Sequence, residues 1–305
     1  MTITKTQNDK VQMTESDLRI TNLRPTPRET WEMMVRFSGP TEAELNAMRQ
    51  TVDVLFQNGY DLVVAAYDHL QHVPETAEVL GWENGVDEKH LAERRRFFTI
   101  WLARTLSIDL GTDFAGYLFH AGHVHAGHGP RHIHTPAMWV TGSMGLVLAG
   151  FAQFIQQAHS DAALVAAALA GWNKYLMIQL NQMMAGYEVA LALDDGPLTL
   201  PVKVFGTARL KWGRKSAAVH YHPGDQVADV LRKLMNYAPV LREIMFAQDW
   251  EEDIKQDSLW STVTPTYLLR DNWRVLLNGQ DLRYNGGFRQ PLHEGDTLEL
   301  FPPGR

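Results

Sequence analysis

Histidines are concentrated in one short stretch of the chain. The segment HAGHVHAGHGPRHIH, residues 120–134, holds six of the thirteen histidines. Imidazole nitrogens bind metals and exchange protons near neutral pH, so this stretch is the first candidate for chemistry. The residue types fit three interpretations: structural histidines, a zinc or nickel site made of several histidines, and a single axial ligand to haem iron.

A helix over this stretch would place the histidines on different sides. His125 ends an apolar side, and His123 lies about 200° around the helix from it, so the two cannot bind one ion. Gly127 and Pro130 end the helix, which leaves the later histidines in a turn. The apolar side that His125 shares is formed by Phe114, Leu118, Ala121 and Gly122.

The spacing alone does not choose among the three interpretations. His120 with His123, or His128 with His132, would supply two metal ligands, but a third is not obvious and the HExxH pattern is absent. One imidazole at the end of an apolar face also suits haem, which needs a single axial histidine against a flat apolar cofactor. Structural histidines fit the same pattern, and all three interpretations stay open at this point.

A helical pattern from about residue 40 to residue 192 positions this stretch. Thr41 and Glu44 have the capping-box spacing of a helix start. Residues 137–155 carry no charge and are long enough to span a bilayer, but internal glycines and the absence of flanking lysines favour a buried core helix. The later helices are predicted at 111–127, 136–158 and 161–192.

The amino-acid composition limits the classes of fold, metal site and partner that the chain can have. The 305 residues are 45% hydrophobic and 21% charged, which predicts two globular domains. The absence of cysteine excludes disulfides and thiolate metal sites, and a net charge of −7 gives no reason to expect nucleic acid. The polar residues 1–24 predict a mobile tail rather than a signal peptide or anchor, so we expect a cytoplasmic protein that does not enter a membrane.

The motif AGHVHAGHG, followed by a proline and a tryptophan, resembles the proximal-histidine segment of the protoglobins and globin-coupled sensors. RFSGPTEAELNAM, VVAAYDHL and NKYLMIQLNQMMAGYEVAL resemble other helices of these globins in the right order, over about residues 26–193. The resemblance implies an all-α globin fold over residues 25–196. It also implies haem b, with His125 as the ligand of its iron, and a diatomic gas (O2, NO or CO) as partner.

The resemblance extends to the surroundings of the cofactor. Tyr67 would hydrogen-bond the gas, although a core tyrosine is the alternative. As in related sensors, the last two helices would form a homodimer. The stretch HGPRHIH is less apolar than the family's continuation, so a haem-free signalling globin stays open. The other residues implied to contact haem are Phe98, Trp101, Leu118, Trp139 and Arg95.

The last hundred residues predict a small mixed domain, residues 197–305. LPVKVFGTARL, AAVHYHPGD, WRVLLNG, FRQPL and TLELF read as strands and QVADVLRKLM as a helix. The end of the chain, GGFRQPLHEGDTLELFPPGR, resembles the β-grasp sulfur carriers, namely the small subunit of molybdopterin synthase and the thiamine sulfur carrier. It lacks their terminal diglycine, which favours docking to a protein partner over sulfur transfer. Residues 245–269 form a longer, more acidic segment than a minimal carrier needs.

The leading hypothesis is a gas-binding haem globin, acting as a sensor and coupled to a β-grasp docking or output domain. The alternative is a sulfur-carrier-like protein of molybdenum-cofactor or thiamine metabolism with a regulatory or haem-free globin. Haem chemistry such as NO dioxygenation would need an electron donor, and no flavin or nicotinamide motif is visible in the sequence. A binding protein is therefore expected rather than an enzyme.

Overall fold

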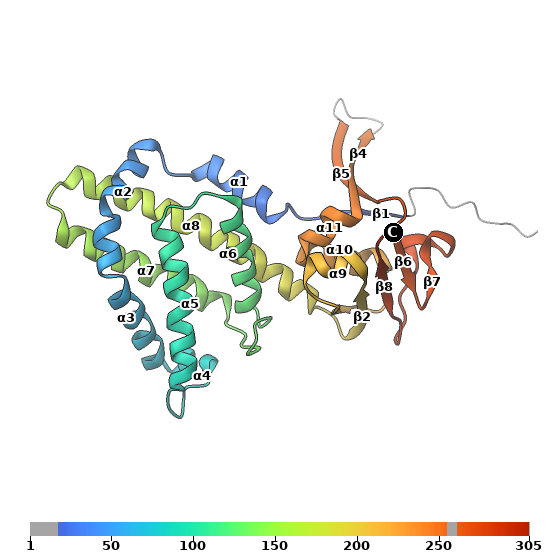
Figure 1. Cartoon of the computed structure of the whole chain (residues 1–305), viewed down its shortest axis with the longest axis horizontal. Helices are drawn as coiled ribbons and strands as arrows, with labels where there is room; N and C mark the ends of the chain where they lie inside the picture. Colours follow the sequence, from blue (N-terminus) through green and yellow to red (C-terminus); the bar gives the residue numbers. More distant parts are fainter. Residues whose placement is uncertain (1–17, 255–260, 305) are drawn as a thin grey trace, which may run out of the picture. The chain divides into compact units, whose positions relative to one another are not determined.

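The computed structural model describes residues 18–254 and 261–304 and divides into two compact units (Figure 1). Pro25–Leu191 form the first, which we call the helical unit. Residues 18–24 and 192–304 form the second, which we call the sheet unit. The helical unit is therefore inserted between two segments of the sheet unit.

The helical unit begins its first two helices with capping boxes. In the one predicted from the sequence, the Glu44 carboxylate accepts from the Thr41 backbone N–H at 2.7 Å, and Thr41 Oγ1 accepts from the Glu44 N–H at 3.3 Å. These bonds satisfy donors that a helix start leaves free. The helices are α1 (Pro27–Ser38), α2 (Glu42–Gln57), α3 (Gly59–His72), α4 (Pro74–Leu80), α5 (Glu88–Leu106), α6 (Thr112–His125), α7 (Ala137–Ala158) and α8 (Ala162–Leu193).

Helices α6 and α8 cross with their backbones in contact. A Cβ atom at Gly122 would lie 2.0 Å from the Met183 carbonyl oxygen, and one at Gly186 would lie 1.9 Å from the Phe119 carbonyl oxygen. Only glycine fits such a crossing. The helix that carries His125 is thus fixed against the longest helix of the unit.

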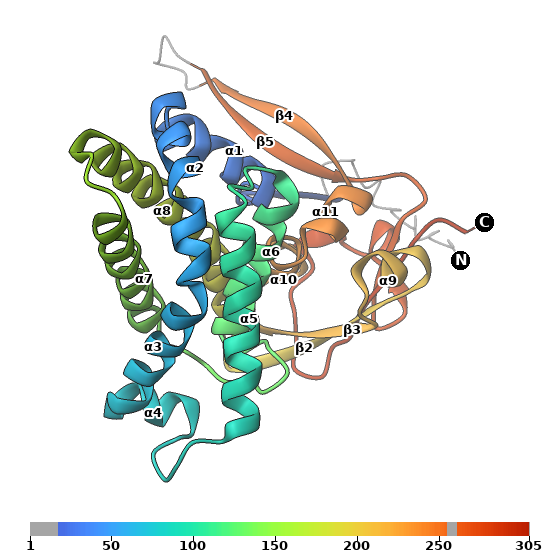
Figure 2. The ribbon, with the colours of Figure 1, turned by 60° about the vertical axis from the view of Figure 1, so that its left-hand side comes forward.

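Helix α7 buries only one side. By length and composition it is the one described helix able to cross a membrane, which is weak evidence, and 28% of its most apolar window is buried. The prediction of a buried core helix holds for that side alone, where the Phe151 ring lies 5.3 Å from the ring of Trp172 on α8. Figures 1 and 2 show α7 beside α8. The buried stripe is Val140, Met144, Val147, Phe151 and Ile155.

The sheet unit contains a mixed sheet in the order β3-β2-β8-β6-β7. β2 runs parallel to β8 and antiparallel to β3, while β6 is antiparallel to both of its neighbours. With helix α10 following the β2–β3 hairpin, this is the β-grasp fold that the sequence predicted. The elements are β2 (Leu198–Val204), α9 (Gly206–Trp212), β3 (Ser216–Tyr221), α10 (Val227–Tyr237), α11 (Pro239–Met245), β6 (Arg274–Leu277), β7 (Gln280–Asp281) and β8 (Leu298–Phe301).

A second sheet, in the order β1-β5-β4, corrects the predicted tail. β1 (Arg19–Thr21) pairs antiparallel with Thr266–Leu268 of β5 (Ser261–Leu269), and Ile20 is buried. Residues 18–24 therefore belong to the sheet unit, whereas residues 1–17 lie outside the described residues. The acidic segment forms the hairpin of β5 with β4 (Phe246–Ile254).

Two strand predictions in this unit were wrong. The strand read in LPVKVFGTARL ends at Val204, because Gly206 takes a left-handed φ of +53° and starts α9. FRQPL contains the short 3-10 turn Gly287–Arg289 instead of a strand. In both places a glycine with positive φ bends the chain away from the extended conformation that alternation suggested.

Candidate functional site

His125 is the last residue of α6. The predicted helix ran to residue 127, but Gly127 takes a φ of +101° and turns the chain. The backbone N–H of Thr135 then returns to donate to the His125 carbonyl oxygen at 2.8 Å, and Ala126 bridges to His134. The turn that follows the helix therefore fixes the backbone of His125 in place.

The imidazole of His125 is neutral. Burial lowers its pKa to about 4, and the positive charge of Arg94 acts in the same direction. The residue is half-buried, and its ring nitrogens make no hydrogen bond with any other described residue. A neutral imidazole with a free lone pair is the form that binds a metal, so this donor fits the axial ligand of haem.

The other histidines have different surroundings. His123 lies on the opposite side of α6, as predicted, but it is buried, with its ring 4.8 Å from Phe119. Nε2 of His90 accepts from Arg94 Nε at 2.9 Å, which occupies the nitrogen a second axial ligand would use. Within residues 18–254 and 261–304, no three His, Asp or Glu side chains gather as a metal site.

Tyr67 of α3 points its hydroxyl at α5. The hydroxyl donates to the Arg94 carbonyl oxygen at 3.2 Å, and burial raises the Tyr67 pKa to about 12 against the opposing charges of Arg94 and Arg95. The ring lies 6.1 Å from Phe98, edge to face. Tyr67 is thus a neutral hydrogen-bond donor, and both interpretations of it, gas contact and core tyrosine, stay open.

The remaining predicted residues divide into a cluster and three separate positions. The Trp101 ring lies 5.3 Å from Phe98, so both join Tyr67 in one aromatic cluster. Leu118 is buried in the core on the His125 side of α6, and Trp139 is half-buried near the start of α7. Arg95 Nη2 lies 3.0 Å from an Asp68 carboxylate oxygen, so this arginine already has an anionic partner.

Arg94 links the two predicted sides of the site, a role that the sequence pattern did not predict. Its carbonyl accepts from Tyr67, its Nε donates to His90, and its charge acts on His125. In the sequence, the run of arginines at residues 94–96 indicates either a solvated helix face or partners for haem propionates. The signal that points to a structural role is the spacing of four residues between His90 and Arg94 on one helix.

The pair of His134 and Tyr187 was also missed. Nε2 of His134 lies 2.7 Å from the Tyr187 hydroxyl, and the rings are stacked with centroids 5.9 Å apart. This contact fastens the turn that follows His125 to α8. Tyr187 belongs to a segment singled out in the sequence, but its partner is 53 residues away and no local pattern connects them.

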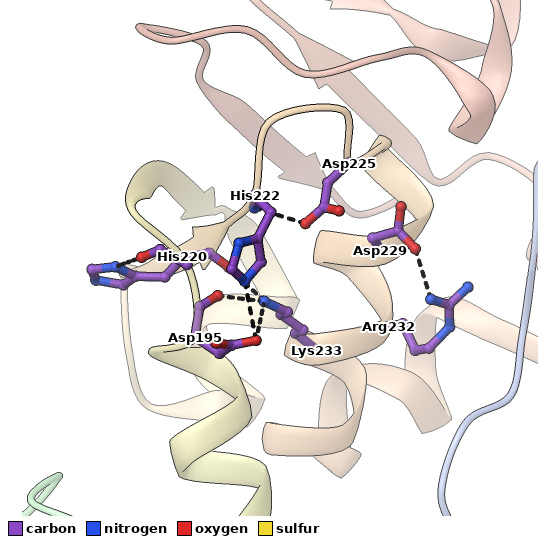
Figure 3. Close-up of polar contacts among 8 residues, drawn as sticks. Asp195, His220, His222, Asp225, Asp229, Arg232 and Lys233 are labelled. Carbon is purple, nitrogen blue, oxygen red and sulfur yellow. Dashed lines mark hydrogen bonds and ion pairs between the residues drawn. The ribbon is translucent and has the colours of Figure 1, made fainter.

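Helix α10 forms hydrogen bonds to both segments of the sheet unit that connect to the helical unit, one before α1 and one after α8. Arg232 Nε donates to the Thr21 carbonyl oxygen at 2.9 Å, on the segment before α1. The next residue, Lys233, donates to the carbonyl oxygen of Asp195, just beyond α8, at 2.6 Å (Figure 3). It also donates to the carbonyl oxygen of His220 on β3 at 2.9 Å. His222 adds an ion-pair contact to Asp195 at 3.3 Å.

Helices α1 to α8 form a globin fold. The Protoglobin family model matches residues 28–192, more than half of the chain, so the chain belongs to the Protoglobin family. Similar solved structures include the globin domain of the Geobacter sulfurreducens globin-coupled sensor (24% identity, TM-score 0.42, 54% of this chain and 99% of that one). The ferric globin domain of Escherichia coli DosC has 16% identity and a TM-score of 0.40, over 52% of this chain and 97% of that one.

The sheet unit has its own structural neighbours. The small archaeal modifier protein SAMP1 from Haloferax volcanii has 24% identity and a TM-score of 0.26, over 35% of this chain and 96% of that one. SAMP1 from Methanosarcina acetivorans has the same identity and TM-score, with 93% of that chain covered. No curated protein matches the chain.

Proposed function

We propose that the helical unit binds haem b through His125 and senses a diatomic gas, O2, NO or CO. The observation that carries this proposal is the imidazole of His125, which is neutral, half-buried and free of hydrogen bonds to other described residues. Haem would supply an iron atom that binds such gases reversibly. The chain's own residues must hold it, exclude water and set the affinity.

Each predicted residue receives a role in this proposal. His125 is the metal ligand, and Tyr67 is the hydrogen-bond donor on the gas side. Phe98, Trp101 and Leu118 supply apolar surface that keeps water out. Trp139 would cover the His125 side, and Arg95 would turn from Asp68 toward a propionate, exchanging one anionic partner for another.

Sensing requires that gas binding shifts an equilibrium felt by the sheet unit. Two covalent connections join the units, one before α1 and one after α8, and α10 holds both through Arg232 and Lys233. A conformational change at either end of the helical unit would therefore alter contacts of the same helix, α10. We propose the sheet unit as the docking or output module, because both connections from the helical unit enter it.

We also propose that α7 and α8 form a homodimer. Helix α7 buries one side, and its other side exposes Met138 and the small residues Gly142, Gly145 and Ala149, which would let a second helix approach closely. Ala149 is exposed on α7, so Ala149→Glu should leave the fold intact and produce a monomer in sedimentation analysis. A wild-type monomer would refute this part, and partition into lipid vesicles would assign the surface to a membrane.

The test of haem binding is a spectroscopic titration of the full chain with haem, followed by reduction and addition of carbon monoxide. We expect a sharp Soret band that saturates at one haem per chain and shifts with carbon monoxide. Haem that adds without saturation or dissociates on gel filtration would show non-specific binding and refute the proposal. In that case the haem-free signalling globin becomes the better account.

A further inference from the structure

The sheet β1-β5-β4 exposes large apolar side chains on one face. Trp250 is 61% exposed and Val263 is 54% exposed. The antiparallel register sets Trp250 opposite Pro265 and Glu252 opposite Val263, so all four residues lie on the same face. We call it the Trp250 face. Exposed tryptophan is unfavourable in water and is enriched where proteins bind one another.

The same strand carries several negative charges. Asp249, Glu251 and Glu252 flank Trp250 and are exposed. Asp249 lies 3.4 Å from Arg19 of β1, but neither Glu251 nor Glu252 forms an ion pair with any described residue. The Trp250 face is therefore bordered by carboxylates that attract cationic groups.

Strand β4 also has a free edge. It is the outer strand of β1-β5-β4, and within the described residues only β5 pairs with it. This leaves outward backbone N–H and C=O groups along the strand, except that the Trp250 N–H donates to the Asp249 carboxylate at 2.9 Å. Figure 1 shows the β4–β5 hairpin projecting beyond the rest of the sheet unit. A long exposed edge is the template that extended peptides use when they add a strand to a sheet.

We propose that β4 is the docking strand for a protein partner that adds an extended segment of alternating apolar and basic residues. An added strand would place every second side chain on the Trp250 face, where an apolar residue packs beside Trp250. The alternate side chains lie on the opposite face beside Asp249 and Glu251, where lysine or arginine is attracted. A second copy of this chain is a poor occupant, because two β4 strands would bring like charges together.

This inference gives the proposed docking role a surface and a partner chemistry. It rests on that role but not on haem binding at His125, so the haem-free chain tests it separately. The probes are three fluorescein-labelled synthetic peptides of equal length. The first alternates valine and lysine, the second has the same composition arranged in two blocks, and the third replaces lysine with glutamate.

Fluorescence anisotropy with the full chain measures the affinity of each peptide. We expect the alternating peptide to bind about ten-fold more tightly than the block peptide, because only alternation matches the two faces of a strand. The glutamate peptide should not bind. Equal binding of the alternating and block peptides would show charge attraction without strand addition and overturn the proposal.

Variants locate the site. Trp250→Ala and Glu251→Lys should each lower the affinity for the alternating peptide by about ten-fold, as loss of a central contact does. Tyr284→Ala and Glu243→Lys alter exposed side chains elsewhere in the unit and serve as matched controls. The proposal is wrong if Trp250→Ala binds like its control, or if the wild type dimerises through Trp250 and binds no peptide. All four substitutions are at exposed positions, and circular dichroism will verify that the variants are folded.

Discussion

The hydroxyl of Tyr67 donates a hydrogen bond to the carbonyl oxygen of Arg94 at 3.2 Å. The same Arg94 carries the charge that, after burial, lowers the pKa of His125. The residues proposed for the two sides of the haem thus both interact with one residue of α5. The phenol must leave the Arg94 carbonyl in order to donate to a gas ligand.

Tyr67→Phe tests whether that exchange occurs. If the phenol donates to bound O2, its loss should raise the dissociation rate of O2 by about ten-fold, the equivalent of one hydrogen bond. Stopped-flow mixing of the oxygenated protein with a scavenger measures the rate. Tyr60→Phe, at an exposed position of the same helix, is the control. A rate unchanged from the control would assign Tyr67 to the core.

Gly122→Ala should destabilise the helical unit strongly. The new methyl group would collide with backbone of α8, at 2.0 Å from the Met183 carbonyl oxygen, so the helices must separate at a cost of about 3 kcal/mol or more. Gly116→Ala in the same helix meets no atom within 4 Å and should instead stabilise by roughly 0.5–1 kcal/mol. Urea unfolding followed by circular dichroism compares them. Similar stabilities for the two variants would contradict the close crossing.

The haem-free chain should lose stability in acid partly through His125. The pKa of His125 is about 4 in the folded state against an ordinary histidine value of 6.5, so between these values the unfolded chain binds a proton that the folded chain does not. Stability therefore falls as the pH decreases from 6.5 to 4. His125→Leu should remove a part of this dependence on the order of 2 kcal/mol. His90, whose pKa burial also lowers, accounts for some of the remaining slope. Parallel pH profiles for wild type and His125→Leu would show that His125 is not held neutral.

Tyr187→Phe should loosen the turn behind His125. It removes the hydroxyl that lies 2.7 Å from His134 Nε2, at an expected cost of about 1 kcal/mol in the free energy of unfolding. Hydrogen exchange at the Thr135 amide, which donates to the His125 carbonyl, should become faster in this variant. Unchanged exchange at Thr135 would mean that Tyr187 does not restrain this turn.

Local signals in the sequence predicted much of the helical unit. The capping box of Thr41 and Glu44 starts α2 where it was expected. The wheel of α6 placed Leu118 and His125 together and His123 opposite. It could not show how closely α6 and α8 approach each other, because the crossing at Gly122 and Gly186 joins residues distant in the sequence.

Long-range pairing explains the errors in the sheet unit. Arg19–Thr21 form β1 only because β5 lies beside them, nearly the whole chain away, and a polar terminal segment carries no sign of such a partner. The role of Arg94 was hidden for a related reason. Its carbonyl partner, Tyr67, is on another helix, and a carbonyl contact leaves no trace in side-chain patterns.

The central claim is that His125 alone among the histidines holds haem. The most direct test compares ferrous and carbonyl spectra of the wild type, His125→Gly and His123→Gly after haem reconstitution. We predict that only His125→Gly loses the histidine-ligated spectrum and that added imidazole restores it. Loss of that spectrum in His123→Gly, with His125→Gly unaffected, would contradict the account.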